Sequence, residues 1–218
     1  MADGVNTNPS DAKPAGDERI RRRRERILDA AFHVFSRAGY KDAAVDDIAQ
    51  EAETSKGGIY FHFPTKEAVF VELMRSTADR LIAKVEREVA HEDDPVDQAD
   101  AAIRTVLATF AGHRSMARLL LIDALGASRT FRVEILRLHE RFAQLIASKL
   151  DRAVADGIIP PLDTRVAGAA WFGAIHEVVI RWLVADTPEP LEDAYPTLRC
   201  LLLRSVGVPE ERLAERAT

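Results

Sequence analysis

This sequence has little cysteine and no excess of positive charge. Cys200 is its single cysteine, so no disulfide can form within one chain, and we expect a reducing compartment, the cytoplasm. The formal net charge of −5 argues against a general coat for nucleic acids. Aromatic residues make up only 6% of the 218 residues, but 47% are hydrophobic, which is ample for a core.

Long apolar runs are missing as well. None approaches the ~18 residues of a membrane-spanning helix, so we predict no association with a membrane. The arginines near the start of the chain are followed by Glu25, Asp29 and His33 instead of the apolar core of a signal peptide. We see no strand-like alternation, internal repeat or glycine-rich phosphate loop, so the sequence predicts an all-helical chain.

The most specific pattern is a pair of short helices joined by a turn. The first helix is predicted by apolar residues at helical spacing, Val45, Ile48, Ala49 and Ala52. After the turn, Ser55 can cap a second helix by accepting from a backbone N–H, and Ile59 and Phe63 can pack inward. Gly57 and Gly58 each cost this helix roughly 1 kcal/mol relative to alanine, so tertiary packing must hold it.

Three stretches in this region resemble the DNA-binding domain of TetR/AcrR-type transcriptional regulators. They are RILDAAFHVFSRAGY (26–40), VDDIA (45–49) and SKGGIYFHFPTKE (55–67). The resemblance implies a helix-turn-helix whose second helix enters the major groove of DNA. It assigns contacts with bases and phosphates to Thr54, Ser55, Lys56, Gly57, Gly58, Tyr60, His62 and Lys66.

Two departures from the family concern the stability of this motif. Family members often carry threonine where Ala43 and Ala44 stand, so a hydroxyl cap is missing. Asp46 and Asp47 can partly compensate, because carboxylates favour the positive end of a helix. The family usually has glycine where Glu53 stands, and a positive φ there would cost about 1–2 kcal/mol.

A third departure concerns sequence recognition. Gly58 offers no side chain where many relatives carry threonine. Base recognition is then expected to depend on DNA shape and on the side chains of Lys56, Tyr60 and His62. We interpret Tyr60 and His62 as DNA contacts, whereas Phe61 and Phe63 are interpreted as core residues.

A run of arginines lies upstream of the motif. Residues 19–26 hold six arginines and one glutamate, although residues 1–62 carry ten Lys and Arg against eleven Asp and Glu. Positive charge is therefore confined to one patch. Because guanidinium groups match phosphate geometry, we predict contacts with the DNA backbone or minor groove from Arg21, Arg22, Arg23 and Arg24. The alternative is an ordinary solvated helix start.

Beyond Lys66 the apolar spacing predicts only helices, which indicates a C-terminal bundle. The expected fold is all-α, with a three-helix DNA-binding domain followed by an effector-binding and dimerisation domain. The predicted helices cover about 65–90, 95–112, 115–125, 131–157, 163–185 and 196–206. The predicted divisions are a disordered tail (1–17), the DNA-binding domain (18–64), the bundle (65–208) and a second tail (209–218).

The helix predicted at 163–185 is apolar or small around most of its circumference, so it needs cover on all sides. In the family, the last two helices of two subunits form a four-helix interface. This implies a two-fold homodimer with its recognition helices about one duplex turn, or a small multiple, apart. The predicted interface residues are Ala169, Phe172, Gly173, Leu198, Leu201 and Leu202. The alternative is that both helices belong to the core of one protomer.

A small-molecule pocket is implied by the same resemblance, because relatives bind hydrophobic or amphipathic effectors. Candidate residues lie on or beside apolar stripes: His113, Asp123, His139, Trp171, His176, Glu177 and Arg181. Each of them alone is more often a satisfied buried group or a surface residue. The stretch EVVIRWL that begins at Glu177 resembles fatty acyl-CoA-responsive members, which makes a fatty acyl-CoA one candidate effector.

Patterns typical of enzymes are weak, and we predict no cofactor and no metal. His176 and Glu177 lack the second histidine of a zinc-protease helix, because position 180 is isoleucine. An enzyme remains the remote alternative if Asp123, His139 and Glu177 converge. We favour a homodimeric repressor that a small effector releases from a palindromic operator. An activator or a protein-interaction adaptor of the same fold is the main alternative.

Overall fold

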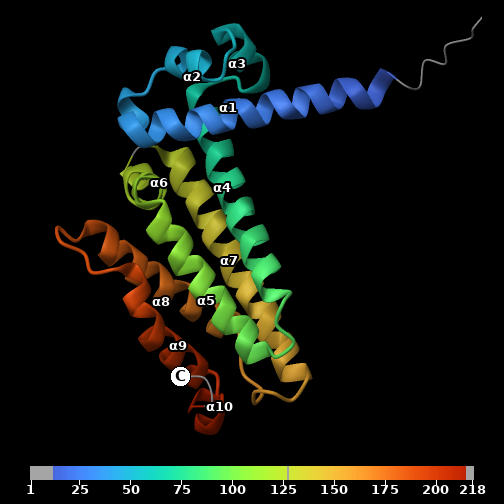
Figure 1. Ribbon diagram of the computed structural model, residues 1–218, viewed down its shortest axis with the longest axis vertical. Coiled ribbons are helices and arrows are strands. Elements are labelled where there is room, and N and C mark those ends of the chain that lie inside the picture. The colour runs from blue at the N-terminus through green and yellow to red at the C-terminus, as the bar shows by residue number, and fades with distance from the viewer. Residues whose placement is uncertain (1–11, 127, 215–218) are drawn as a thin grey trace, which may run out of the picture. The chain divides into compact units, whose positions relative to one another are not determined.

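The computed structural model describes residues 12–126 and 128–214, and all regular structure within them is helical (Figure 1). The helices are α1 (Ala12–Asp42), α2 (Val45–Glu51), α3 (Lys56–His62), α4 (Lys66–Val89), α5 (Pro95–Gly112), α6 (Arg114–Leu121), α7 (Arg129–Ala155), α8 (Thr164–Val184), α9 (Tyr195–Ser205) and α10 (Glu210–Ala214), with 3-10 turns η2 (Asp123–Gly126) and η3 (Leu191–Ala194). The predicted all-α fold is confirmed.

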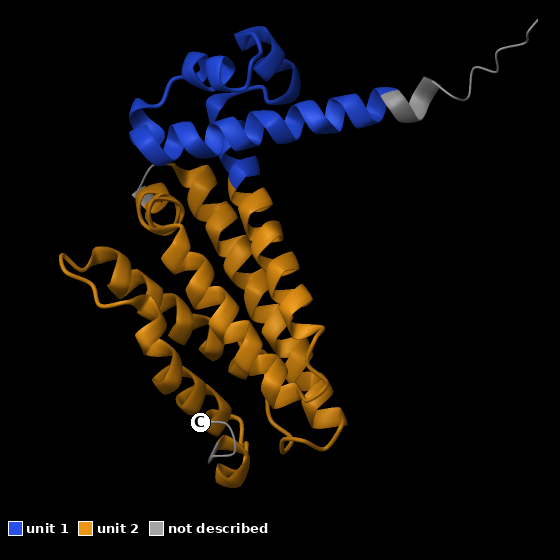
Figure 2. Cartoon of the chain, viewed as in Figure 1, with its two compact units in different colours: residues 1–73 blue, residues 74–218 orange. Residues whose placement is uncertain are grey.

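The chain divides into two compact units, residues 1–73 and 74–218 (Figure 2). The division falls inside α4, so the first unit also contains the first turns of that helix. The two predicted tails are in part helical, since α1 begins at Ala12 and α10 covers Glu210–Ala214. Residues 1–11 and 215–218 of those tails lie outside the described residues.

Inward-facing residues of α1 to α4 form the core of the first unit. Its largest fully buried side chains are Ile27, Phe35, Ile48, Ile59, Phe70 and Leu73. The rings of Phe35 and Phe70 meet edge to face with 5.1 Å between their centroids, an arrangement that adds to the gain from burying their area. This packing joins α1 to the start of α4 and leaves α2 and α3 to cover the rest of the core.

α3 is capped and buried as its sequence predicts. Ser55 Oγ accepts from the backbone N–H of Gly58 at 3.1 Å, and Ile59 and Phe63 are buried. The interpretation of Phe61 as a core residue is wrong, because its side chain is 75% exposed. Phe61 follows Ile59 by two positions, about 200° around the helix, so the two cannot share a face.

The turn between α2 and α3 holds Glu53 in the backbone conformation for which the sequence analysis gave a cost. Glu53 has a φ of 50° and is the only non-glycine residue with positive φ in the described part of the chain. The N–H of Thr54 donates to the carbonyl of Ala49 at 2.9 Å, which closes a helix end that normally favours glycine at position 53. At the other end of α2 the hydroxyl cap is missing. A carboxylate oxygen of Asp47 accepts there from the backbone N–H of Ala44 at 3.3 Å, which partly compensates for it.

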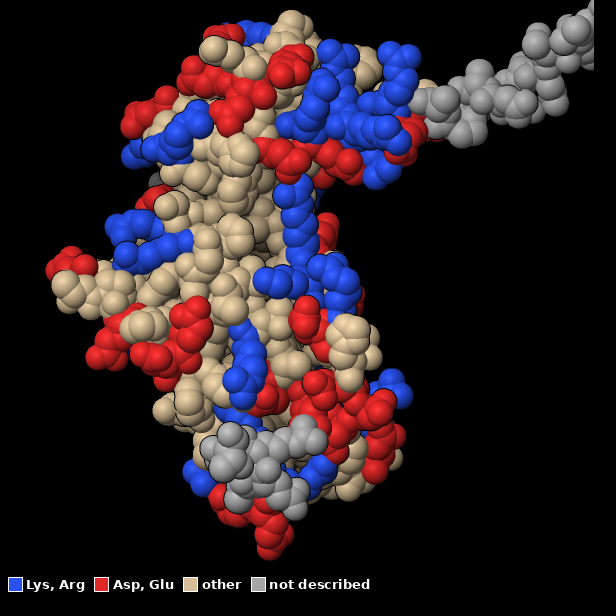
Figure 3. All heavy atoms as spheres, viewed as in Figure 1, with Lys and Arg blue, Asp and Glu red and all other residues tan. Residues whose placement is uncertain are grey.

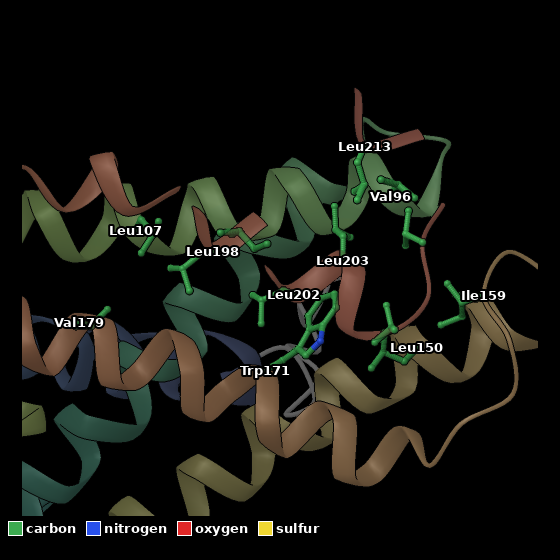
Figure 4. Packing of buried hydrophobic residues seen from close by; sticks show 14 of the residues in the cluster. Val96, Leu107, Leu150, Ile159, Trp171, Val179, Leu198, Leu202, Leu203 and Leu213 are labelled. Carbon is green, nitrogen blue, oxygen red and sulfur yellow. The ribbon is translucent and has the colours of Figure 1, made fainter. Parts of the chain in front are cut away.

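In the second unit, α7 and α8 pack closely along their length. A Cβ on Gly168 would lie 2.6 Å from the carbonyl oxygen of Ala143 and 2.9 Å from the backbone nitrogen of Ala147, so only glycine fits there. The core beside this pair includes residues of α5, α8 and α9 (Figure 4). Trp171 lies in that core and donates from its indole N–H to Ser205 Oγ at 3.0 Å, which joins α8 to α9.

Ion pairs in which one partner is buried tie further helices of this unit together. The guanidinium of Arg75 in α4 makes two bonds of 2.7 Å to the buried carboxylate of Glu134 in α7. Arg199 in α9 is also buried and donates to Asp100 of α5 at 2.7 Å and to the carbonyl of Leu213 at 3.2 Å. α9 and α10 are thereby fixed to α5.

α8 is the one helix in the described ranges that is long and apolar enough, by length and composition alone, to cross a membrane. The expectation that no stretch approaches that length was therefore wrong for this helix. Only 22% of the apolar stretch is buried within the protomer. One side of α8 packs closely against α7, and its outward side remains uncovered in the single chain.

Candidate DNA interface and effector site

The outer face of α3 presents the side chains that suit contact with DNA. Lys56, Gly57 and Tyr60 are exposed, whereas Ile59 on the same helix is fully buried. Phe61 is exposed beside them and joins this surface, although the sequence analysis missed it. Its position two residues after a buried isoleucine was the pattern that could have placed it outside.

An ion pair holds Lys56 against the neighbouring helix. Its ammonium lies 2.8 Å from a carboxylate oxygen of Asp46 at the start of α2. The hydrogen bond that Lys56 donates to Asp46 raises the pKa of Lys56, so the side chain stays charged. Both side chains are exposed, which means that a phosphate oxygen can replace the carboxylate at little cost.

The arginine run divides into two kinds of contact. Arg21 and Arg22 pair with glutamates of their own helix: Glu18 for both, and Glu25 for Arg21 as well. Arg23 and Arg24 instead reach other elements. Arg23 Nη2 donates to Thr54 Oγ1 at 3.0 Å.

Arg24 is fixed from two sides. Its guanidinium lies 2.7 Å from a carboxylate oxygen of Glu72 in α4 and stands over the ring of Phe63 at 5.3 Å. Figure 3 shows Lys and Arg side chains gathered over α1 with Asp and Glu beside them. The patch is thus positive but interleaved with carboxylates, as the nearly balanced charge of this region predicts.

His62 and Lys66 are less available than the resemblance implies. His62 is half-buried, and its pKa is lowered by burial and by the nearby charges of Arg23 and Arg24, so the imidazole is neutral at pH 7. Lys66 donates to the carbonyl of Lys41 at 3.1 Å and stands over the ring of Tyr40 at 4.8 Å. Its ammonium therefore caps the end of α1, and burial lowers its pKa.

Two of the predicted effector residues meet between α7 and α8. The rings of His139 and His176 have centroids 4.8 Å apart, and His139 lies equally close to Phe172. Nε2 of His139 is buried without a hydrogen-bond partner among the described residues. Burial lowers the pKa of both histidines, so this place combines neutral imidazoles with the stacked rings of Phe142 and Phe172.

The other predicted effector residues lie elsewhere. His113 is exposed at the junction of α5 and α6, and Asp123 is exposed at the start of η2. Glu177 pairs with Arg181 at 2.7 Å on the exposed side of α8, while Trp171 belongs to the protomer core. In the described ranges no group of three or more His, Cys, Asp or Glu side chains could hold a metal ion.

Only some of the predicted interface residues lie at the surface of the protomer. Ala169, Gly173 and Leu201 are exposed, and Phe172 is half-buried. Leu198 and Leu202 are 6% and 1% exposed, so assigning them to an interface was wrong: both side chains point into the protomer core (Figure 4). The hollow along the outer side of α9 is open to the surface and is lined by Pro196, Thr197, Cys200, Leu201, Arg204 and Ser205.

Two family descriptions match the two parts of the chain. "Bacterial regulatory proteins, tetR family" matches residues 27–73, and "Tetracyclin repressor-like, C-terminal domain" matches residues 92–204. The chain belongs to the TetR family of DNA-binding transcriptional regulators. The predicted family, the helix-turn-helix and the C-terminal regulatory domain are thereby confirmed.

Relatives carry names of regulators. EthR, a transcriptional regulator of Mycolicibacterium smegmatis, is 31% identical over 161 residues, which cover 70% of this chain and 70% of EthR. SlmA, a nucleoid occlusion factor of Vibrio vulnificus, is 25% identical over 167 residues, which cover 75% of this chain and 85% of SlmA. Regulation of transcription, and not catalysis, is the activity that the name of EthR and the family descriptions state.

Solved structures share the fold over most of their length. The fatty acid degradation regulator FadR from Bacillus halodurans superposes with a TM-score of 0.73 at 25% identity, over 82% of this chain and 97% of FadR. FadR from Bacillus subtilis, solved in complex with stearoyl-CoA, has a TM-score of 0.73 at 24% identity, over 85% of this chain and 98% of that one. The second likeness shows the fold alone.

Proposed function

We propose that this TetR-family regulator is a homodimeric, cytoplasmic repressor of transcription. It binds a palindromic operator and leaves it when a small hydrophobic or amphipathic effector binds, with fatty acyl-CoA as the effector class we favour. The observation that carries the proposal is the outer face of α3, where Lys56, Gly57 and Tyr60 are exposed on a helix whose other side is fixed by Ile59 and Phe63.

DNA binding is tested with duplexes from a pool with a randomised centre. The protein should enrich a palindromic sequence from this pool. Replacing Tyr60 by alanine should then weaken binding to that sequence by about 1–3 kcal/mol if Tyr60 contacts a base. The free energies are measured by fluorescence anisotropy. Failure of the wild-type protein to enrich any sequence would end the proposal.

Dimerisation is supported by the uncovered sides of α8 and α9. Val166 and Val184 in α8 are 60% and 55% exposed, and Leu201 in α9 is 56% exposed. Between the two valines, Ala169 and Gly173 are exposed and small, which permits close approach of a second helix. Covering these side chains removes apolar area from water, the main favourable term in association.

The dimer can be tested without disturbing the protomer fold. A Cβ on Gly173 would have no heavy atom within 4 Å, so Gly173→Leu fits the single chain. In a dimer that uses this face, the added side chain should raise the dissociation constant measured by sedimentation. Ala108→Leu, at an exposed position of α5, is the matched control and should leave the constant unchanged. Equal dissociation constants for both variants and the wild type would remove α8 from the interface.

The effector is supported by fold and by composition. FadR from Bacillus subtilis was solved in complex with stearoyl-CoA on the same fold, and the core of the second unit here is rich in Leu side chains. α4 belongs to both compact units, so it is the covalent element through which an effector can act on DNA binding. Release by a factor of one hundred needs roughly 2.7 kcal/mol of differential affinity between two states of the protein.

Two experiments separate this mechanism from its alternatives. Native mass spectrometry of the protein purified from its own cells reports the stoichiometry and the mass of any retained compound. Titration with stearoyl-CoA should then weaken binding to the enriched duplex, and unchanged affinity would rule out this effector class. Transcription from the cognate promoter with and without the protein separates repression from activation, while a stable protein partner in a pull-down would favour an adaptor.

A further inference from the structure

The space beside Gly58 on α3 is already occupied by two other side chains. A Cβ on Gly58 would lie 2.4 Å from Thr54 Oγ1, 3.4 Å from Ser55 Oγ and 3.6 Å from Nη2 of Arg23. The hydroxyl of Thr54 also accepts from that Nη2 at 3.0 Å. A guanidinium from α1 therefore lies directly beside the place from which a side chain at position 58 would project on the recognition helix.

Neighbouring contacts hold this guanidinium in place. Arg23 lies before residue 27, where the match to the family's DNA-binding domain begins, so its position depends on the N-terminal extension of α1. The next residue, Arg24, anchors that extension to Glu72 and to the ring of Phe63. Because Phe63 directly follows α3, this part of α1 is fixed relative to the recognition helix.

The remaining donors of Arg23 suit a base edge. Thr54 takes one N–H of Nη2, and the side chain is exposed, so the second N–H of Nη2 can donate to an outside acceptor together with Nε or Nη1 on the same edge of the guanidinium. Arginine bonded to the O6 and N7 acceptors of guanine is the commonest specific contact in the major groove. A planar fork that is held before binding loses less entropy when it forms such bonds.

We propose that Arg23 recognises a guanine in each half of the operator, from the place that Gly58 leaves open on α3. Thr54 acts as the positioning residue for the guanidinium. Glycine at position 58 leaves the Thr54 hydroxyl in this position, because a Cβ there would lie 2.4 Å from Thr54 Oγ1 and force that hydroxyl to move. This inference rests on the proposed operator binding. It adds Arg23 of α1 to the residues of α3 that are proposed to contact bases.

The test compares the sequence preferences of variants. Wild type and the variants Arg23→Ala, Arg23→Lys, Thr54→Val and Gly58→Ala are each selected against a pool of duplexes with a randomised centre. All four variants should lose the preference for guanine at the same position of each half-site, by roughly ten- to hundredfold, and keep the preferences elsewhere. Arg23→Lys retains the charge, so its total affinity should fall less than that of Arg23→Ala.

Arg22→Ala is the matched control, because Arg22 pairs with Glu18 on the same helix and lies away from Thr54. It should weaken binding to all duplexes evenly. Circular dichroism melting of each variant shows whether the fold is intact. If Arg23→Ala and Arg23→Lys keep every base preference of the wild type, whatever their affinity, the proposal is overturned. A wild-type protein that enriches no sequence overturns the proposed operator binding itself.

Discussion

α3 and α8 each carry one crowded glycine and one open glycine. In α3, a Cβ on Gly58 would collide with Thr54 Oγ1, whereas Gly57 has only Ser55 Oγ nearby, at 3.9 Å. In α8, Gly168 is crowded by the backbone of α7, whereas Gly173 has nothing within 4 Å. Both open glycines face outward, toward the surfaces where DNA and a second subunit are proposed to approach.

The two crowded glycines differ in what crowds them. At Gly58 the obstacle is a hydroxyl that can rotate away, so a substitution changes a contact and leaves the helix in place. At Gly168 the obstacle is the carbonyl of Ala143, so a substitution must move a whole helix. Gly58 therefore affects which groups α3 presents to DNA, whereas Gly168 allows α8 to pack closely against α7.

The largest effect should come from removing the support of α3. Ile59→Ala deletes a fully buried side chain from a seven-residue helix with two glycines, and should lower the free energy of unfolding by about 2–5 kcal/mol. Urea unfolding followed by circular dichroism measures this loss. Phe61→Ala removes a side chain of similar apolar character from the same helix, but at an exposed position, and should change stability by less than about 0.5 kcal/mol. Equal losses would mean that α3 does not depend on its inner face.

The second effect tests the glycines of α8. Gly168→Ala should cost about 1–3 kcal/mol, because α7 and α8 must separate to admit the methyl group. Gly173→Ala has open space and gains helix propensity, so it should be neutral or stabilise by up to about 1 kcal/mol. Thermal unfolding of both variants at several protein concentrations separates the protomer from any dimer. A loss at Gly173 as large as that at Gly168 would abolish the distinction between crowded and open glycines.

The same contrast explains what could be predicted from the sequence. In the first unit, short spaced motifs fixed the helix-turn-helix, the Ser55 cap and the inward direction of Ile59 and Phe63, because these depend on contacts a few residues apart. The glycine usually found in that turn raised the question of a positive φ at Glu53 but did not answer it, because a glutamate can also sit in a turn of ordinary φ. Phe61 was assigned to the core because it is aromatic. Its angle of about 200° around the helix from Ile59 places it on the outside instead.

In the second unit, apolar spacing predicted the helices but could not decide which neighbour each face meets. Leu198 and Leu202 were assigned to an interface and lie in the protomer core, since a leucine stripe looks the same in both settings. The meeting of His139 with His176 depends on how α7 and α8 are aligned, and no local pattern encodes it. The contact from Arg23 to Thr54 spans two helices and was equally hidden.

A third effect concerns the ion pair on α7 and its response to acid. The hydrogen bonds from Arg75 lower the pKa of Glu134 below its ordinary value of 4.5. A lowered carboxyl pKa contributes stability that is present above pH 4.5 and is lost as the pH falls through the lowered pKa. Glu134→Gln should therefore cost about 1–2 kcal/mol at neutral pH, since Arg75 is partly screened by solvent, and much less in acid.

Urea unfolding of Glu134→Gln and wild type at several pH values measures this difference. Glu140→Gln, an exposed position one helical turn and a half further along α7, is the control and should show little difference at any pH. A difference for Glu134→Gln that stays constant down to pH 3 would show that the carboxylate charge is not what stabilises the pair.

The smallest effect should come from the strained turn that joins α2 to α3. Glu53→Gly removes a positive-φ cost of about 1–2 kcal/mol but gives the unfolded chain more freedom, so the net gain should be about 0.5–1 kcal/mol. Gln50→Gly, an exposed position inside α2, should instead lose about 1 kcal/mol, because its backbone is helical. Opposite signs in urea unfolding show that backbone conformation, and not glycine as such, sets the effect. If both variants were destabilised, the turn would not be strained, and the stability of α3 would depend on its packing alone.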